Sequence, residues 1–298
     1  MRKIFKITAL SMLVALSTLT LSAQNPDSVT FVTTKAAATA EKDGIIFNNY
    51  LFEGNLFNSN QCISVLEIPA GFHFDIVIAP EGTLVKTSSL AAELNAIAAL
   101  NGSFFNMRTP YGGVTYTRVD GTTISDNNKD VPTPFWSRGI RQNGAVAILY
   151  GDLYIVKADQ LRNWEKYIFA EDVLTSGPIL MVDGELEPQA PDKFNTNRHP
   201  RTAVGKRSDG TVVFVVVDGR LPEAAGVSTT ELSLIMSWLG CRDALNLDGG
   251  GSSTMVFDGN VVNHPSDNKK FDHQGERVVA NAIVVRDAGY KVRVSSGF

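Results

Sequence analysis

Short runs of β-branched and aliphatic residues, separated by Asp-Gly pairs, constrain this chain more than any other feature. The dipeptide Asp-Gly occurs seven times in 298 residues. Asp183-Gly184, Asp209-Gly210 and Asp258-Gly259 each lie between two such runs, where the pair supplies the positive-φ positions of a hairpin turn. The pattern predicts a chain built mainly from strands that turn back on themselves.

Two helical segments interrupt these runs. The sequence predicts a helix over 87–95 and another over 229–239, which Gly240 ends. Strands are predicted over the apolar runs 63–68, 72–78, 96–100, 145–150, 153–156, 179–182, 212–217, 244–247 and 278–286. Because the helices are few and irregularly spaced, we expect an α+β fold: a strand-rich mixed sheet domain with a few short helices.

The chain begins with the pattern of an export signal. Three basic residues precede the uncharged apolar run Ile7–Leu21, and the small residues Ser22 and Ala23 follow it. We expect residues 1–23 to be a cleaved signal peptide, which predicts a periplasmic or extracellular protein. A retained N-terminal anchor is the alternative.

The rest of the chain divides by composition. Residues 24–60 are polar and weakly periodic, and they are predicted to form an N-terminal extension or an early hairpin. Residues 61–298 are predicted to form the main domain. Hydrophobic residues make up 44% of the chain, which is enough for a sizeable core.

Charge and cysteine content exclude several classes of partner. The chain has 27 basic and 31 acidic residues, which gives no positive surface for nucleic acid or an anionic membrane. We expect no stable membrane insertion after signal cleavage. Cys62 and Cys241 are the two cysteines, and the sequence leaves open whether they form a disulfide or stay free thiols. Because no metal-ligand spacing occurs, we predict neither a metal nor a cofactor.

A glycine-rich segment after a predicted strand is the strongest candidate for a site. Asp248 opens the run Gly249-Gly250-Gly251-Ser252-Ser253-Thr254. Three consecutive glycines are costly in chain entropy and bring no side chain to the core. Such a run fits a place where the backbone turns sharply or approaches a ligand closely.

Five motifs together resemble the phosphodiester glycosidase family. In chain order they are Asn101-Gly102-Ser103-Phe104-Phe105-Asn106, Ser176-Gly177-Pro178, Arg198-His199-Pro200-Arg201-Thr202-Ala203-Val204-Gly205, Val217-Asp218-Gly219-Arg220, and Asn246 to Thr254. The stretch 277–282 fits the same pattern, and the match covers about residues 60 to 290. The resemblance implies removal of N-acetylglucosamine from a phosphodiester, leaving free sugar and a phosphate monoester.

The residue types suit that chemistry independently. A phosphate monoester leaves as a stable anion, so its departure needs positive charge and directed donors more than protonation. Arg201 and Arg220 offer bidentate donors, and the turn 249–254 is expected to present backbone N–H groups as an anion nest. Positive charge that develops on the sugar calls for carboxylates, for which Asp218 and Asp248 are the candidates.

The complete set of predicted site residues has two parts, and each member has a structural alternative. Glu231 stands three residues after Ser228 at a helix start, where a capping box would explain it without catalysis. The predicted catalytic residues are Asp218, Asp248, Arg220 and Glu231. The predicted substrate-binding residues are Asn101, Asn106, His199, Arg201, Thr202, Gly249, Gly250, Ser252, Ser253 and Thr254.

Two other functions compete with a glycosidase. A non-catalytic protein that binds glycans or sugar phosphates would use the same polar residues. A serine hydrolase would use Ser252 or Ser253, but Thr254 stands where a G-x-S-x-G elbow has its second glycine. A P-loop is excluded because no lysine follows the glycines.

Overall fold

The computed structural model describes residues 25–126 and 142–287. The predicted signal peptide lies outside these residues. Strands dominate, as predicted, and every strand pair within the described ranges is antiparallel. None of the helices in these ranges is long and apolar enough to cross a bilayer.

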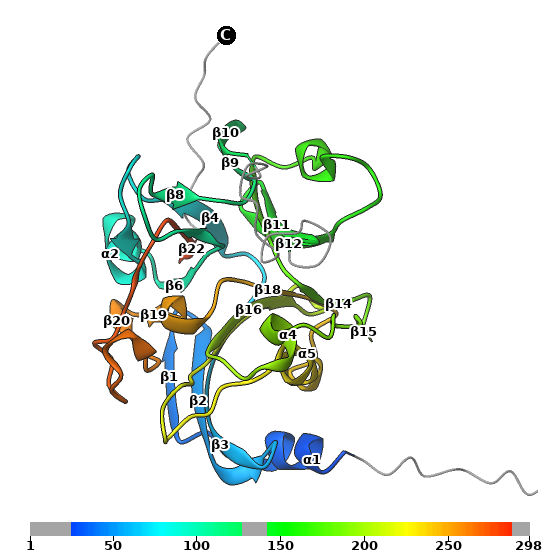
Figure 1. Ribbon diagram of the computed structural model, residues 1–298, viewed down its shortest axis with the longest axis vertical. Helices are drawn as coiled ribbons and strands as arrows, with labels where there is room; N and C mark the ends of the chain where they lie inside the picture. The colour runs from blue at the N-terminus through cyan, green and yellow to red at the C-terminus, as the bar shows by residue number, and fades with distance from the viewer. Residues whose placement is uncertain (1–24, 127–141, 288–298) are drawn as a thin grey trace, which may run out of the picture.

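An eight-stranded sheet forms the largest layer (Figure 1). Its order is β1 (Ala38–Lys42), β2 (Ile45–Leu56), β3 (Ser59–Ile68), β17 (Val212–Val217), β16 (Arg201–Lys206), β18 (Asp243–Asn246), β14 (Ile179–Val182) and β15 (Glu185–Leu186). The segment 25–60 contributes two of these strands, so the predicted boundary at residue 60 falls inside one sheet rather than between separate bodies.

Two five-stranded sheets lie beside the large one (Figure 1). One has the order β10 (Thr122–Ser125), β9 (Thr117–Val119), β13 (Asp172–Ser176), β11 (Gly144–Leu149) and β12 (Asp152–Lys157). The other has the order β20 (Asn260–Val261), β19 (Met255–Phe257), β6 (Ala98–Asn101), β22 (Asn281–Arg286) and β4 (His73–Ile78). Two small ribbons pair β21 (Val278–Val279) with β5 (Val85–Lys86) and β7 (Phe105–Asn106) with β8 (Gly112–Gly113).

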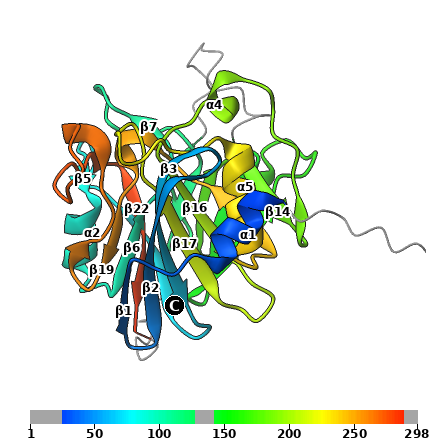
Figure 2. The same ribbon diagram turned by 90° about the horizontal axis from the view of Figure 1, so that it is seen from below.

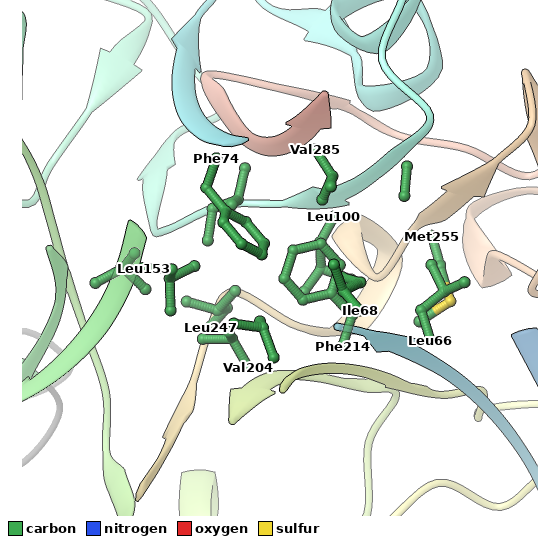
Figure 3. Close-up of a cluster of buried hydrophobic side chains, with 14 of the residues drawn as sticks. Leu66, Ile68, Phe74, Leu100, Leu153, Val204, Phe214, Leu247, Met255 and Val285 are labelled. Atoms are coloured by element: carbon green, nitrogen blue, oxygen red, sulfur yellow. The ribbon is translucent and has the colours of Figure 1, made fainter. Parts of the chain in front are cut away.

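The main core lies where the three larger sheets meet (Figure 3). β17 shows how alternation builds it, because all six of its residues are buried. Val212, Phe214 and Val216 face this core, while the alternate residues Val213, Val215 and Val217 face a second cluster. A strand covered on both faces reads as a continuous apolar run, which explains why the sequence located β17 without error.

The helices cover the outer faces of the sheets. Figure 2 shows α1 (Pro26–Thr33) and α5 (Thr229–Trp238) on the same side of the large sheet, where Phe31, Leu232 and Ile235 close the second cluster. α2 (Thr87–Glu93) packs on the sheet that contains β6, and α4 (Lys193–Thr196) contacts α5. Three short 3₁₀ helices complete the described elements: η2 (Trp164–Tyr167), η3 (Gly250–Ser252) and η4 (Ser266–Asn268).

Candidate active site

Three neighbouring strands of the large sheet bring the predicted site loops to one edge. β17 and β18 both pair antiparallel with β16, so they run in the same direction. Asp218 directly follows β17, Asp248 follows β18 by two residues, and Pro200 directly precedes β16. The sheet therefore gathers these three loops at a single end, where a rigid scaffold positions them.

Close backbone packing around Pro200 explains three glycines at this edge. A Cβ on Gly219 would lie 2.8 Å from the Gly226 Cα, and one on Gly249 would lie 2.7 Å from the Pro200 carbonyl oxygen. A Cβ on Gly226 would lie 2.5 Å from the backbone just before Pro200. The Pro200 carbonyl also accepts the Gly250 N–H at 2.8 Å. These contacts fix the positions of the loops that carry the site.

Asp248 is partly exposed where the glycine turn begins. Its Oδ1 accepts the N–H of Gly249 at 2.9 Å. Burial against the surrounding protein raises the pKa of Asp248 to about 6, opposed by Ser252, the Gly249 N–H, Arg277 and Arg220. A carboxyl group with a pKa near 6 is suited to chemistry near neutral pH.

Arg220 lies against the same turn with an exposed side chain. Its φ of 65° is left-handed, which is uncommon for a residue with a side chain and typical of functional sites. A Cβ on Gly250 would lie 3.0 Å from a guanidinium nitrogen of Arg220. Within the described ranges no protein acceptor binds this guanidinium. Desolvation and then Arg277 lower the pKa of Arg220, while Asp267 and Asp248 raise it.

Arg277 is a second cation at the turn, to which the sequence analysis gave no site role. Its Nε donates to Asp267 Oδ2 at 3.1 Å, and the ion pair covers Gly251 so closely that no Cβ would fit there. Its Nη1 lies 3.7 Å from the sulfur of Met107. In the sequence, Arg277 is the first residue of the stretch 277–282 that fits the family pattern. The apolar run after it predicts a strand, so nothing in this stretch was a reason to place Arg277 in the site.

The expected anion nest of backbone N–H groups is wrong, because protein atoms already accept these protons. Five of the N–H groups in 249–254 donate within the protein: Gly249 to Asp248 Oδ1, Gly250 to Pro200 O, Ser252 to Gly249 O, Ser253 to Gly250 O and Thr254 to Asn101 Oδ1. Positive charge for an anion must come from side chains instead, namely Arg220 and Arg277.

Three buried hydroxyls follow the glycines. The side-chain oxygens of Ser252, Ser253 and Thr254 are buried and have no hydrogen-bond partner within the described ranges. Ser252 is near enough to influence Asp248, but no hydrogen bond of normal geometry joins them. Buried polar atoms without a partner are uncommon, and these three are enclosed by the turn and not presented at the surface. Since none bonds to a histidine, the arrangement disfavours a serine hydrolase.

Asn101 and Thr202 support the turn from below. The Asn101 side chain accepts from Thr202 Oγ1 at 2.9 Å and from the Thr254 N–H at 3.0 Å, and it donates to the Asp248 carbonyl at 2.7 Å. Both side chains are fully buried. The predicted substrate-binding pair therefore holds Asp248 and Thr254 in place, a positioning role.

Asp218 is buried beneath the turn, with 1% of its surface exposed. Its carboxylate accepts from Asn263 Nδ2 at 2.9 Å, from the His264 N–H at 3.0 Å and from His264 Nδ1 at 2.9 Å. Asn263 also donates to the Ser253 carbonyl, which ties Asp218 to the turn. A carboxylate enclosed in this way acts through its neighbours, which corrects the prediction of direct contact with substrate.

Cys62 lies beside this pair. Its Sγ, a carboxylate oxygen of Asp218 and a ring nitrogen of His264 lie within 4.8 Å of one another. Burial, and then Asp218, raise the pKa of the Cys62 thiol, so the neutral thiol is favoured. Since His264 and Asn263 already occupy the carboxylate, hydrogen bonding accounts for the cluster. Cys62 and Cys241 are both free and buried, which settles the disulfide question.

Arg201 holds loops together in the structure, which differs from its predicted role in binding phosphate. Its side chain is buried and donates to the carbonyls of Val227 at 3.0 Å, Asn197 at 3.1 Å, and Phe194. The guanidinium carbon also lies 4.8 Å from the centre of the Phe194 ring. A guanidinium engaged on several sides holds loops together and is not presented to a ligand.

Glu231 also has a structural role, which corrects its catalytic assignment. It forms the capping box of α5 with Ser228, accepting the Ser228 N–H at 2.8 Å and donating its own N–H to Ser228 Oγ at 3.1 Å. Arg198 Nε donates to both of its carboxylate oxygens, at 3.1 and 3.2 Å. The capping alternative from the sequence explains Glu231 completely.

His199 and Asn106 lie at the rim of the site. Burial, Arg201 and then Arg220 lower the pKa of His199, so its imidazole favours the neutral form close to Arg220. Asn106 ends β7, one residue before Met107. The chain 107–111 is exposed between β7 and β8, which places this hairpin tip beside Arg277.

One hollow of the described residues lies away from the glycine turn. A cavity of about 490 Å³ opens between the β11–β12 hairpin and the segment around η2, lined by Tyr154, Trp164, Tyr167 and Phe169 among others. None of the predicted site residues lines it.

Comparison with known proteins decides the family. The sequence profile of the phosphodiester glycosidases matches residues 94–286, which span the glycine turn, Arg220 and Arg277. The chain belongs to the phosphodiester glycosidase family. This membership confirms the resemblance drawn from the five motifs.

Individual relatives are distant. Mouse N-acetylglucosamine-1-phosphodiester alpha-N-acetylglucosaminidase is 28% identical over 189 residues, which cover 57% of this chain and 33% of the mouse protein. The aligned region is thus a third of that relative's length.

Solved structures of other proteins share the fold at low identity. The catalytic domain of the zebrafish enzyme of the same name, auto-inhibited by its pro-peptide, matches with a TM-score of 0.65 and 16% identity over 85% of this chain and 87% of that one. A putative exported protein from Burkholderia pseudomallei matches with a TM-score of 0.54 and 19% identity, covering 78% and 75% of the two chains.

Proposed function

We propose that this phosphodiester glycosidase is exported and hydrolyses a sugar-1-phosphodiester of the N-acetylglucosamine-phosphate-sugar type. The products are free sugar and a phosphate monoester. One observation carries this proposal: Arg220 and Asp248 lie at the same glycine turn. Arg220 has no protein acceptor in the described ranges, and Asp248 brings a carboxyl group. The name of the mouse relative supports the choice of sugar.

The two charges suit the two halves of such a substrate. A phosphodiester carries one negative charge, which Arg220 and Arg277 neutralise while the bond to the anomeric carbon breaks. Asp248 then stabilises the positive charge that develops on the sugar.

The test is hydrolysis of matched substrates by the mature chain. N-acetylglucosamine linked through phosphate to a second sugar is compared with the simple glycoside that lacks the phosphate, and the released sugar is measured. We expect the phosphodiester to react faster. Equal rates on both substrates would remove the phosphate from the mechanism, and binding without turnover would favour a sugar-phosphate binding protein.

Two arginine variants test whether the faster hydrolysis of the phosphodiester depends on Arg220. Arg220→Lys keeps the charge but loses the bidentate fork, so we expect a loss of about 10- to 150-fold in kcat/KM from the ~1.5–3 kcal/mol of a charge-assisted contact. Arg242→Lys is the control, because Arg242 is an exposed arginine paired with Asp183 at a distant turn. Near-wild-type kinetics for Arg220→Lys would demote Arg220 to a surface residue.

Export rests on the N-terminal signal pattern and is consistent with the exported protein among the structural matches. We expect the mature protein to begin near Gln24. N-terminal sequencing of protein from the periplasm or medium of expressing bacteria tests this, and an uncleaved N-terminus would favour the anchored alternative.

A further inference from the structure

His264 is a titratable side chain beside the glycine turn to which the proposed mechanism gives no role. Its ring nitrogen Nδ1 lies 2.9 Å from Asp218 Oδ2, and its own backbone N–H donates to the same carboxylate. The ring stacks on Phe271, with 3.7 Å between centroids, and on His273, with 4.6 Å. Position and rotation of the imidazole are therefore fixed from several sides.

The contacts of Asp218 determine which ring nitrogen carries the proton. An ionised carboxylate only accepts hydrogen bonds, so Nδ1 of His264 must donate to it. In the neutral ring this leaves Nε2 with a free lone pair. No protein partner for Nε2 occurs in the described part of the chain, and 15% of the side chain stays exposed. Nδ1 faces a buried carboxylate, so Nε2 lies on the side of the ring away from Asp218.

Three connections place His264 at the proposed site. Asp218 stands two residues before Arg220 on the same loop. Asn263, the residue before His264, joins Asp218 to the Ser253 carbonyl at 3.1 Å. Three residues after His264, Asp267 covers the glycine turn together with Arg277.

We propose that His264 accepts the proton of the water that attacks the sugar, with Asp218 as its positioning residue. The inference rests on the proposed hydrolysis. The water oxygen forms a bond to the anomeric carbon while one of its protons passes to Nε2. The bond from that carbon to the phosphate oxygen breaks, and its electron pair stays on the departing phosphate monoester. His264 then releases the proton to solvent.

Hydrolysis of a phosphodiester needs a base for the attacking water but no acid for the leaving phosphate. The phosphate monoester leaves as an anion and needs no proton, so an acid is not required on that side. The attacking water must lose a proton, and a base positioned for this contributes about 10²- to 10⁴-fold. Cys62 cannot serve as this base, because it is fully buried and its pKa is raised.

The test uses His264→Ala with His73→Ala as its control. His73 lies in β4, outside the site, and its Nε2 contacts Asp75 Oδ1 at 3.1 Å. We expect His264→Ala to lose about 10²- to 10⁴-fold in kcat on the phosphodiester. Added imidazole should restore part of the rate in a saturable manner, because it fills the space between the remaining rings. His73→Ala should retain most of the rate and gain nothing from imidazole.

A second measurement tests the role of Asp218 without relying on activity. In ¹⁵N-histidine NMR of the wild-type protein, we expect His264 to carry its proton on Nδ1. In Asp218→Asn the amide no longer favours that tautomer, so the signals should shift toward protonated Nε2, and kcat should fall while KM changes little. Assays with and without a chelator separate this mechanism from a metal site at Cys62, Asp218 and His264.

The outcomes distinguish the inference from the function on which it rests. If wild-type protein hydrolyses no phosphodiester, the proposed function fails and takes the inference with it. If wild-type protein is active and His264→Ala is as active, only the inference fails. Loss of activity without imidazole rescue would make His264 structural, and activity that a chelator abolishes and zinc restores would replace the proton-transfer role with a metal site.

Discussion

The raised pKa of Asp248 makes the pH dependence of this enzyme predictable. Only the charged carboxylate stabilises positive charge on the sugar, and burial raises its pKa to about 6. We therefore expect kcat/KM to rise about tenfold per pH unit below 6 and to level off above it. Asp248→Asn should lower kcat/KM by a factor on the order of 10² or more and remove the part of this rise that Asp248 causes.

The same shift determines how Asp248 affects stability. Its pKa is higher in the folded protein than the ordinary 3.8, so the folded state holds the proton longer than the unfolded chain. This group favours folding most below pH 4, and its contribution declines as pH rises to about 6. A shift of this size corresponds to at most about 3 kcal/mol, which already includes the hydrogen bond from the Gly249 N–H. Asp248→Asn should accordingly melt no earlier than wild type at pH 7.

Asp172 provides the control for this experiment. Burial also raises the pKa of Asp172 to about 6, but its carboxylate accepts the N–H groups of Asp120 and Ile76 between two sheets, away from the site. Asp172→Asn should change the pH dependence of melting and leave the pH dependence of kcat/KM intact. The reasoning is refuted if Asp248→Asn keeps full activity, melts much earlier, or leaves the shape of the pH profile below pH 6 unchanged. Activity that falls above pH 6 would make Asp248 an acid instead.

Three further variants test the assignments around the turn. Glu231→Gln preserves the capping bond, so turnover should stay near wild type with a loss of about 1 kcal/mol or less in stability; a stable but inactive protein would restore its catalytic role. Gly250→Ala places a methyl 3.0 Å from the Arg220 guanidinium, at a φ of +66°. KM for the phosphodiester should therefore rise several-fold, and the unfolding free energy should fall by about 1 kcal/mol. An unchanged KM would show that Arg220 does not bind the phosphate. Arg201→Gln should lower the unfolding free energy by about 2–5 kcal/mol, while kcat of the folded fraction stays near wild type; loss of kcat without loss of stability would return Arg201 to the site.

Local patterns located most of the strands but not all of them. β17 and β14 are found where expected because strands buried on both faces read as unbroken apolar runs. For residues 24–60 an early hairpin was one of two expectations, and β1 and β2 form that hairpin. Their bounds were not located, since all of β1 is exposed and its polar sequence resembles a linker. β2 is a strand because β3 supplies its hydrogen bonds and one face is buried, and neither condition is visible within residues 25–60.

Site residues that are next to a glycine in the sequence were easier to predict than site residues that are distant from the glycines in the sequence. Asp248 and Arg220 belong to motifs whose glycines bring no side chain to the core, so the sequence itself marked them. Arg277 and His264 come from the chain after β19, and only the fold places them at the turn. Arg201 and Glu231 share the residue types of a site, but their hydrogen bonds to backbone and to Arg198 depend on partners that the sequence does not specify.

Because the glycine turn is not an anion nest, the positive charge of the site comes from side chains. With five backbone N–H groups committed to protein acceptors, the glycines do not bind the anion themselves. Their lack of side chains instead lets the two guanidiniums of Arg220 and Arg277 approach the turn from outside. Desolvation and then Arg277 lower the pKa of Arg220, so a bound anion would stabilise its charged form. The proposed substrate supplies this anion as its phosphate, and Asp248 provides the opposite charge for its sugar.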